Sequence, residues 1–278
     1  MFEILKAVLF GIVEGITEWL PVSSTGHILL LDEFIQLQGS DPFKSMFNVV
    51  IQLGAILAVI VLFFHKLNPL ALSKTREEKG KTWILWFKVC VAILPSGILG
   101  VLFDDWMELH LHKAVPIAIA LIVYGIAFLF LERGNKGKFV KRIEDVHDIS
   151  WKTAIFIGCF QVLSLIPGTS RSGSTILGAI LLGVGRSAGA EFSFFMAIPT
   201  MLGASALKLL KFLMEGVKAT GIEIMVLIVG CVVSFIVSLL VIRGLMAFVR
   251  KRSFAVFGVY RIILGAVVLL YFLLTLIL

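Results

Sequence analysis

Two short stretches of this sequence gather the residue types that handle phosphate groups. The first reads Glu14-Gly-Ile-Thr-Glu18-Trp-Leu-Pro21-Val-Ser-Ser-Thr-Gly-His27, and the second reads Gln161-Val-Leu-Ser-Leu-Ile-Pro167-Gly-Thr-Ser-Arg171-Ser-Gly173. Carboxylates bind metal ions or accept protons, hydroxyl and imidazole groups act as nucleophiles, and guanidinium groups neutralise anionic oxygens. Together these residue types predict a site of phosphoryl transfer.

Glu14 and Glu18 are the candidate metal ligands. They stand four residues apart, so on a helix they share one face. Two carboxylates this close destabilise one another in apolar surroundings unless a proton or a cation lies between them. Mg²⁺ and Ca²⁺ prefer such oxygen ligands, and Mg²⁺ commonly bridges protein carboxylates to substrate phosphates. We therefore predict a Mg²⁺ or Ca²⁺ site, the alternative being a protonated or hydrogen-bonded pair at a helix contact.

The hydroxyl groups that follow Pro21 are candidates for a role at a phosphate site. Pro21 should break the preceding helix, because its ring removes a donor and clashes with the turn before it. Ser23, Ser24 and Thr25 can then cap a second helix, whose free backbone N–H groups attract phosphate. Plain capping is the alternative role for all three hydroxyls. His27 adds a group that can act as nucleophile, general base or general acid near neutral pH.

Arg171 supplies the complementary charge from the second stretch. It lies in a Gly/Ser turn where backbone N–H groups can converge, and its guanidinium fits two phosphate oxygens at once. The alternative is a loop arginine paired with a distant carboxylate. The predicted catalytic residues are Glu14, Glu18, Ser24, His27 and Arg171, and the predicted phosphate-binding residues are Ser23, Thr25, Gly26, Thr169, Ser170, Arg171 and Ser172.

The elements that position these residues are predicted to be membrane helices. Hydrophobic residues make up 59% of the chain and charged residues only 15%, which is typical of an integral membrane protein. Residues 1–278 are predicted to form one polytopic membrane domain. Six stretches approach the roughly 20 residues that span a bilayer, namely 46–64, 84–103, 114–132, 190–212, 222–243 and 254–276.

Segments 3–35 and 153–184 are predicted to be re-entrant helical hairpins. Each is an apolar helix broken by a proline and a Ser/Gly turn, a pattern tolerated at membrane depth only beside protein or a water-filled cavity. The two breaks match at a common offset of about 145 residues. We therefore expect two repeats, about 1–135 and 150–278. Each would have three spans and inverted topology, with the site between them near the midplane.

The basic residues indicate topology rather than a nucleic-acid partner. The net charge is +7, but the cations cluster in short loops at 66–81, 133–152 and 250–252. By the positive-inside rule these loops are cytoplasmic, and both termini lie outside.

Several other residues carry weaker expectations. Arg186 and Glu191 are expected to pair with one another, and Arg261 is expected to be either an interfacial anchor or a ligand. All three cysteines are expected to pack in the core, because their neighbours in the sequence are apolar. They are Cys90, Cys159 and Cys231.

At both stretches the chain resembles the bacterial undecaprenyl-diphosphate phosphatase family, also called the bacitracin-resistance protein family. The resemblance extends to Val50-Ile-Gln-Leu-Gly-Ala and Glu191-Phe-Ser-Phe, and Thr169 stands where the family varies. It implies a membrane enzyme that converts undecaprenyl diphosphate to the monophosphate and inorganic phosphate. That reaction recycles the lipid carrier for peptidoglycan and confers bacitracin resistance.

The resemblance also implies site roles and partners. It assigns metal or acid–base work to Glu14 and Glu18, catalysis to Ser24 and His27, and phosphate binding to Ser170 and Arg171. Mg²⁺ or Ca²⁺ is the implied cofactor. The bacterial cytoplasmic membrane is the implied location, with a site open to the external face, lipid contacts and possible homodimers.

The alternative function is a transporter or lipid flippase, because inverted repeats with broken helices are typical of transporters. It predicts movement of lipid or solute without release of phosphate.

Overall fold

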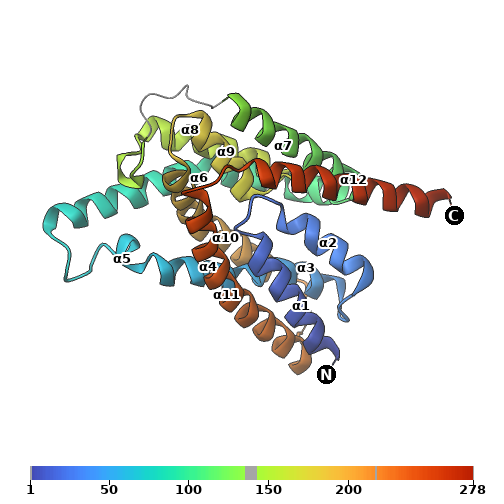
Figure 1. Ribbon diagram of the computed structural model, residues 1–278. Coiled ribbons are helices and arrows are strands. Elements are labelled where there is room, and N and C mark those ends of the chain that lie inside the picture. The colour runs from blue at the N-terminus through green and yellow to red at the C-terminus, as the bar shows by residue number, and fades with distance from the viewer. Residues whose placement is uncertain (1, 135–142, 217, 278) are drawn as a thin grey trace.

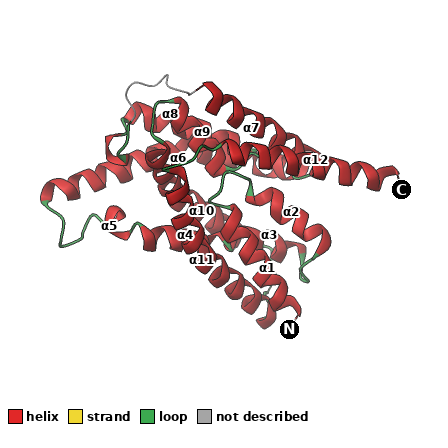
Figure 2. Cartoon of the chain, viewed as in Figure 1, coloured by secondary structure: helices red, strands yellow, loops and turns green. Residues whose placement is uncertain are grey.

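The computed structural model describes residues 2–134, 143–216 and 218–277, and these residues are almost entirely helical (Figures 1 and 2). An isolated β-bridge joins Ile143 and Val184. The α-helices are α1 (Phe2–Thr17), α2 (Ser24–Phe34), α3 (Asp41–Val50), α4 (Gln52–Leu62), α5 (Phe64–Leu67), α6 (Arg76–Leu111), α7 (Ala114–Gly134), α8 (Trp151–Val162), α9 (Arg171–Leu181), α10 (Arg186–Met214), α11 (Gly221–Val249) and α12 (Ala255–Ile277). Short 3₁₀ turns, η1 (Val146–Asp148) and η2 (Leu163–Leu165), flank α8.

Six helical segments of the described chain are long and apolar enough to cross a membrane. They are Asp41–Leu62, Arg76–Phe103, Ala114–Arg133, Arg186–Met214, Gly221–Val249 and Ala255–Thr275. Each overlaps one of the predicted spans, and the first is built from α3 and α4 together. The prediction of an all-helical protein with six spans is confirmed.

The remaining apolar segments fold as two helix–turn–helix units. In each unit the first helix ends before the proline, α1 at Thr17 and α8 at Val162. Ser23 caps α2 and Ser170 caps α9, and both have a φ of 72°. A positive φ in a residue other than glycine costs about 1–3 kcal/mol unless its surroundings hold it. The two turns therefore share one strained cap geometry, which the surrounding structure must hold in place.

The first helix of each unit packs on a long helix from the other half of the chain. Gly11 of α1 lies against α11, where an added Cβ would approach Gly230 O to 2.7 Å. Gly158 of α8 lies against α6, where an added Cβ would come still closer to Ala92 O. Only glycine permits backbones to approach this closely. The two halves therefore interlock rather than lie side by side.

The connections gather at two ends of the helices. In Figure 1 the α5–α6 connection lies at the left, whereas the α2–α3 connection and both labelled termini lie at the right. Two ion pairs join different helices: Lys66 pairs with Glu191 at 2.6 Å, and Arg186 pairs with Glu132 at 2.6 Å. The expected pairing of Arg186 with Glu191 is therefore wrong, because each meets a closer partner from another helix.

Some of the loop cations that predicted the topology, at positions 136, 138, 141 and 142, lie outside the described residues.

The cysteines differ from expectation for a physical reason. Cys90 and Cys159 are exposed, and Cys231 is half-buried with its thiol 3.5 Å from Val50 O. The prediction of core packing is wrong for the first two. In a membrane helix an apolar neighbourhood is as typical of the lipid-facing side as of the core.

Candidate active site

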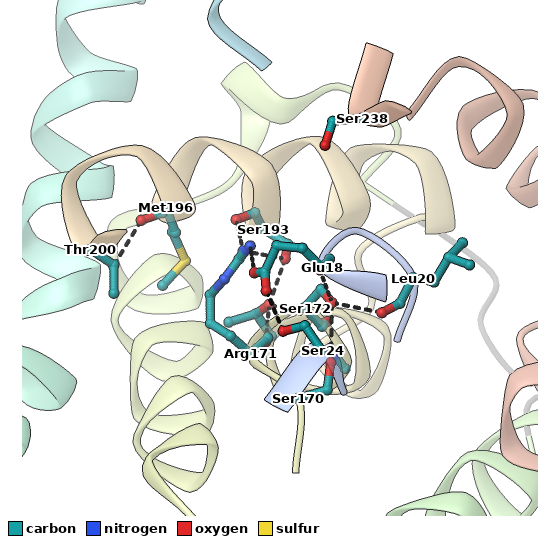
Figure 3. A network of polar contacts seen from close by, with 12 residues as sticks. Glu18, Leu20, Ser24, Ser170, Arg171, Ser172, Ser193, Met196, Thr200 and Ser238 are labelled. Atoms are coloured by element: carbon teal, nitrogen blue, oxygen red, sulfur yellow. Dashed lines mark hydrogen bonds and ion pairs between the residues drawn. The ribbon is translucent and has the colours of Figure 1, made fainter. Parts of the chain in front are cut away.

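The turns of the two helix–turn–helix units meet, although their residues are far apart in the sequence (Figure 3). The Ser172 hydroxyl lies 3.0 Å from Glu18 O and 3.2 Å from Leu20 O, within donating distance of both carbonyls. Arg171 forms an ion pair with Glu18, with Nη2 2.9 Å from Oε1. The acidic Glu18 and the basic Arg171, which belong to segments far apart in the sequence, thus lie in one buried centre.

Glu18 contacts both Ser24 and Arg171 at this centre. Its side chain is only 6% exposed, and both carboxylate oxygens accept hydrogen bonds. Oε1 accepts from Arg171, and Oε2 accepts from the Ser24 hydroxyl at 2.6 Å. A serine hydroxyl that donates to a carboxylate is arranged to lose its proton to that carboxylate when it attacks an electrophile. Ser24 therefore has a base in contact.

Arg171 is held by more than this ion pair. Its Nη1 donates to Ser193 O on α10 at 2.8 Å, and its guanidinium lies 5.7 Å from the ring centre of Trp19. Its Nε is buried and has no hydrogen-bond partner among the described residues. A buried donor without a partner costs about 1–3 kcal/mol. This unsatisfied N–H suits an incoming phosphate oxygen.

A cavity of about 190 Å³ opens beside this centre. The predicted site residues that line it are Glu18, Ser24, Thr25, Ser170 and Arg171. Further polar groups come from Gln52, Ser164 and Thr200, and apolar surface comes from Pro167, Met201 and Ala204. Polar and apolar walls together suit an anionic headgroup attached to a hydrocarbon chain.

Glu14 is buried and is not among the residues that line the cavity. It is 1% exposed, and its charged neighbours are Glu18 and Arg171. Its Oε1 has no hydrogen-bond partner among the described residues. The described residues contain no group of three or more His, Cys, Asp or Glu side chains able to hold a metal ion.

His27 is turned away from the cavity. Its Nδ1 lies 2.7 Å from Ser23 O, and its Nε2 lies 2.7 Å from the Tyr260 hydroxyl on α12. It is not among the residues that line the cavity. Its catalytic role stays a prediction, but both ring nitrogens are engaged elsewhere.

The other predicted phosphate-binding residues form the framework of the turns. Ser23 accepts from Gly26 N at 3.3 Å as the cap of α2, and its side chain is buried. Thr169 is fully buried and does not line the cavity, and Ser172 ties the two turns together. Ser170 both caps α9 and faces the cavity.

Comparison with known proteins identifies the family. Residues 7–267 match the family described as bacitracin resistance protein BacA. The chain belongs to the BacA family. A protein of Lactiplantibacillus plantarum named undecaprenyl-diphosphatase is 56% identical over 98% of both chains. A protein of that name from Enterococcus faecalis is 58% identical over 96% of both, and one from Streptococcus suis is 54% identical over 98% of this chain and 97% of its own.

In this BacA-family chain, sequence reasoning missed the role of Arg261. It is fully buried, with Nη1 donating to Pro21 O at 3.1 Å and Nη2 to Gly168 O at 2.8 Å. It is therefore neither an interfacial anchor nor a lining residue of the cavity, but a link between the two turns. The signal was present, since an arginine within an apolar span is costly unless it is paired inside the protein.

Proposed function

We propose that this chain is an undecaprenyl-diphosphate phosphatase of the bacterial cytoplasmic membrane. It hydrolyses undecaprenyl diphosphate to undecaprenyl phosphate and inorganic phosphate, which recycles the lipid carrier for peptidoglycan synthesis and confers bacitracin resistance. Full-length relatives that carry this enzyme name support the assignment. The observation that carries it is the buried Ser24–Glu18–Arg171 constellation at a cavity with polar and apolar walls.

The geometry favours Ser24 as the nucleophile. Ser24 attacks the terminal phosphorus while Glu18 takes its proton, and the bond to the bridging oxygen breaks as undecaprenyl phosphate departs with the electron pair. Glu18 passes that proton to the departing phosphate. In a second step water attacks the phosphoserine, and Glu18 transfers a proton from water to Ser24 as inorganic phosphate leaves.

Arg171 and the helix starts stabilise the charge on the transferred group. Arg171 lines the cavity, and its buried Nε–H has no hydrogen-bond partner among the described residues. Helices α2 and α9 begin at Ser24 and Arg171, so their first backbone N–H groups also favour negative charge at this point. Donors fixed before the substrate arrives stabilise the transition state without reorganising.

We assign a Mg²⁺ or Ca²⁺ ion to Glu14 and Glu18. The residues fit such an ion, because two buried carboxylates adjoin and Glu14 Oε1 lacks a partner among the described residues. When bound, the cation would neutralise diphosphate oxygens. Its remaining ligands would be phosphate and water oxygens, the arrangement that Mg²⁺ favours.

Phosphate release by the purified protein tests the function and the cofactor together. We expect release from undecaprenyl diphosphate in detergent, its loss with a chelator, and its recovery on adding Mg²⁺ or Ca²⁺. Glu14→Gln should raise the metal concentration needed for half-maximal activity by about tenfold or more, because a charged ligand is lost.

The matched control is Glu191→Gln, which removes a carboxylate paired with Lys66 away from the cavity. It should leave the metal requirement unchanged. Absence of phosphate release, combined with movement of lipid in sealed vesicles, would overturn the enzyme and favour the transporter. Full activity in chelator would overturn the cation site.

The topology that we propose is an inverted repeat with two re-entrant hairpins. Its support is the equivalence of the two turns. Glu14 and Gln161 stand the same number of residues before the strained caps Ser23 and Ser170, and both have a buried Oε1 without a partner in the described chain. The crossed packing of α1 on α11 and α8 on α6 is what two interlocked, inverted copies would produce.

We assign the basic loops to the cytoplasm and the cavity opening to the external side. The cavity residues of α10 begin at Thr200, in the half of that helix farther from Glu191, which pairs with Lys66 of the basic loop at 66–81. In a background with Cys90, Cys159 and Cys231 replaced by alanine, Ser73→Cys should react with an impermeant thiol reagent only from the cytoplasmic side. Lys218→Cys should react only from outside, and labelling of both from one side would contradict the topology. A homodimer stays a prediction.

A further inference from the structure

Two adjacent residues of α12, Tyr260 and Arg261, hold the turn that presents Ser24, and they do so from outside the cavity. Arg261 reaches Pro21 O directly at 3.1 Å. Tyr260 reaches the turn through His27, its hydroxyl lying 2.7 Å from Nε2. Neither residue lines the cavity. The inference drawn from this arrangement rests on the proposed phosphatase function.

The contact between Tyr260 and His27 has a defined direction. His27 Nδ1 lies 2.7 Å from Ser23 O, and a carbonyl oxygen can only accept, so Nδ1 carries the proton. In the neutral ring, Nε2 is then an acceptor, and the Tyr260 hydroxyl donates to it. The two rings are parallel within 1°, with centres 5.7 Å apart. His27 is thereby fixed in one tautomer and one orientation.

The group that His27 holds is the strained cap. Ser23 has φ 72° and ψ 99°, outside the region that a serine ordinarily adopts. Such a conformation persists only where neighbouring contacts hold it. Its carbonyl is bonded by His27, and its side chain accepts from Gly26 N at 3.3 Å. The next residue is Ser24, whose hydroxyl must stay 2.6 Å from Glu18 to be activated.

We propose that Tyr260 is a positioning residue for the phosphatase reaction. It acts through His27 on the Ser23 carbonyl. In this way it orients the Ser24 hydroxyl toward phosphorus and maintains the hydrogen bond from that hydroxyl to Glu18. His27 is on this view a positioning residue as well, and it acts on the turn rather than on the substrate. A small displacement of a nucleophile lowers the rate of attack more than it lowers binding, since aligned geometry is required only in the reacting complex.

Tyr260→Phe removes the hydroxyl and keeps the ring. We expect kcat for undecaprenyl diphosphate to fall about fivefold to tenfold, with KM within about twofold, because one hydrogen bond in the chain of contacts is lost. The matched control is Tyr271→Phe on the same helix, where the ring contacts Phe34 and Phe272. It should keep the kcat of the original protein.

A double-mutant cycle tests whether Tyr260 acts through His27. His27→Ala should lower kcat by more than Tyr260→Phe does. Adding Tyr260→Phe to His27→Ala should change kcat by less than about twofold, because the contact between Tyr260 and the Ser23 carbonyl through His27 is already lost. Equal losses in the presence and absence of His27 would overturn the proposal. A Tyr260→Phe protein with unchanged kcat, or with a raised KM alone, would overturn it too.

Imidazole ¹⁵N spectra in detergent test the contact without substrate. The chain has 5 histidines, so the signals that disappear in His27→Ala identify His27. Tyr260→Phe should move the His27 Nε2 signal and leave the other histidines unchanged, whereas an unmoved Nε2 signal would overturn the proposal. If the original protein releases no phosphate but this shift is seen, the proposed function fails while the contact stands.

Discussion

Ser24→Ala should lower kcat for phosphate release from undecaprenyl diphosphate by about 10⁴-fold or more, the scale on which enzymes lose activity when a nucleophile is removed. The hydroxyl lines the cavity and donates to Glu18 Oε2 at 2.6 Å, so this candidate nucleophile has a base in contact. Binding of the diphosphate should change little, because Arg171 and the helix starts remain. Single-turnover kinetics with purified protein would measure both quantities.

The control for this substitution is Ser238→Ala. Ser238 is also fully buried and donates to Gly15 O at 3.4 Å on α1, but it does not line the cavity. It should retain kcat within about twofold. Rapid acid quenching should also trap a phosphoserine in the original protein but not in Ser24→Ala. If Ser24→Ala kept activity within tenfold and phosphohistidine were trapped, His27 would be the nucleophile.

Arg171→Ala should lower kcat/KM by about 10³-fold, the lower end of the range for removing an arginine that stabilises a transferring phosphoryl group. The substitution removes the charge beside the phosphate and also leaves Glu18 without its ion pair at 2.9 Å. Arg171→Lys should recover only part of this loss, since an ammonium cannot span Glu18, Ser193 and a phosphate oxygen at once. Steady-state kinetics over a range of substrate concentrations would separate the two variants.

The matched control for Arg171→Ala is Arg186→Ala. Arg186 pairs with Glu132 at 2.6 Å, a partly buried arginine–glutamate ion pair between α10 and α7. Its loss should lower the thermal stability of the protein in detergent while leaving kcat/KM within a few-fold. Equal effects of both substitutions on kcat/KM would mean that Arg171 serves stability rather than phosphate.

Several features of the fold were predictable because their causes are local. A span needs about 20 apolar residues, and that is a property of a continuous segment. The breaks near Pro21 and Pro167 follow from the missing N–H and the ring clash of proline. The serine caps follow from the ability of a hydroxyl to accept from a helix start. None of these depends on what lies across the molecule.

Other features depended on partners that sequence spacing does not reveal. Arg186 and Glu191 are near neighbours in the chain, but each meets a partner from another helix. Arg261 is surrounded by apolar residues in sequence, while in space it meets the carbonyls of both turns. Cys90 and Cys159 have equally apolar neighbours and are exposed.

The amino-acid sequence was enough to predict the class of protein, the number of spans, the positions of the two breaks and the kinds of chemistry that their residues can perform. Composition, proline geometry and side-chain reactivity are properties of a residue and its near neighbours. The packing of the helices was needed to show that Glu18 pairs with Arg171, that Ser24 lines the cavity, and that His27 contacts Tyr260 instead. Those outcomes depend on how interlocked helices from the two halves pack, and packing joins residues that the chain keeps far apart.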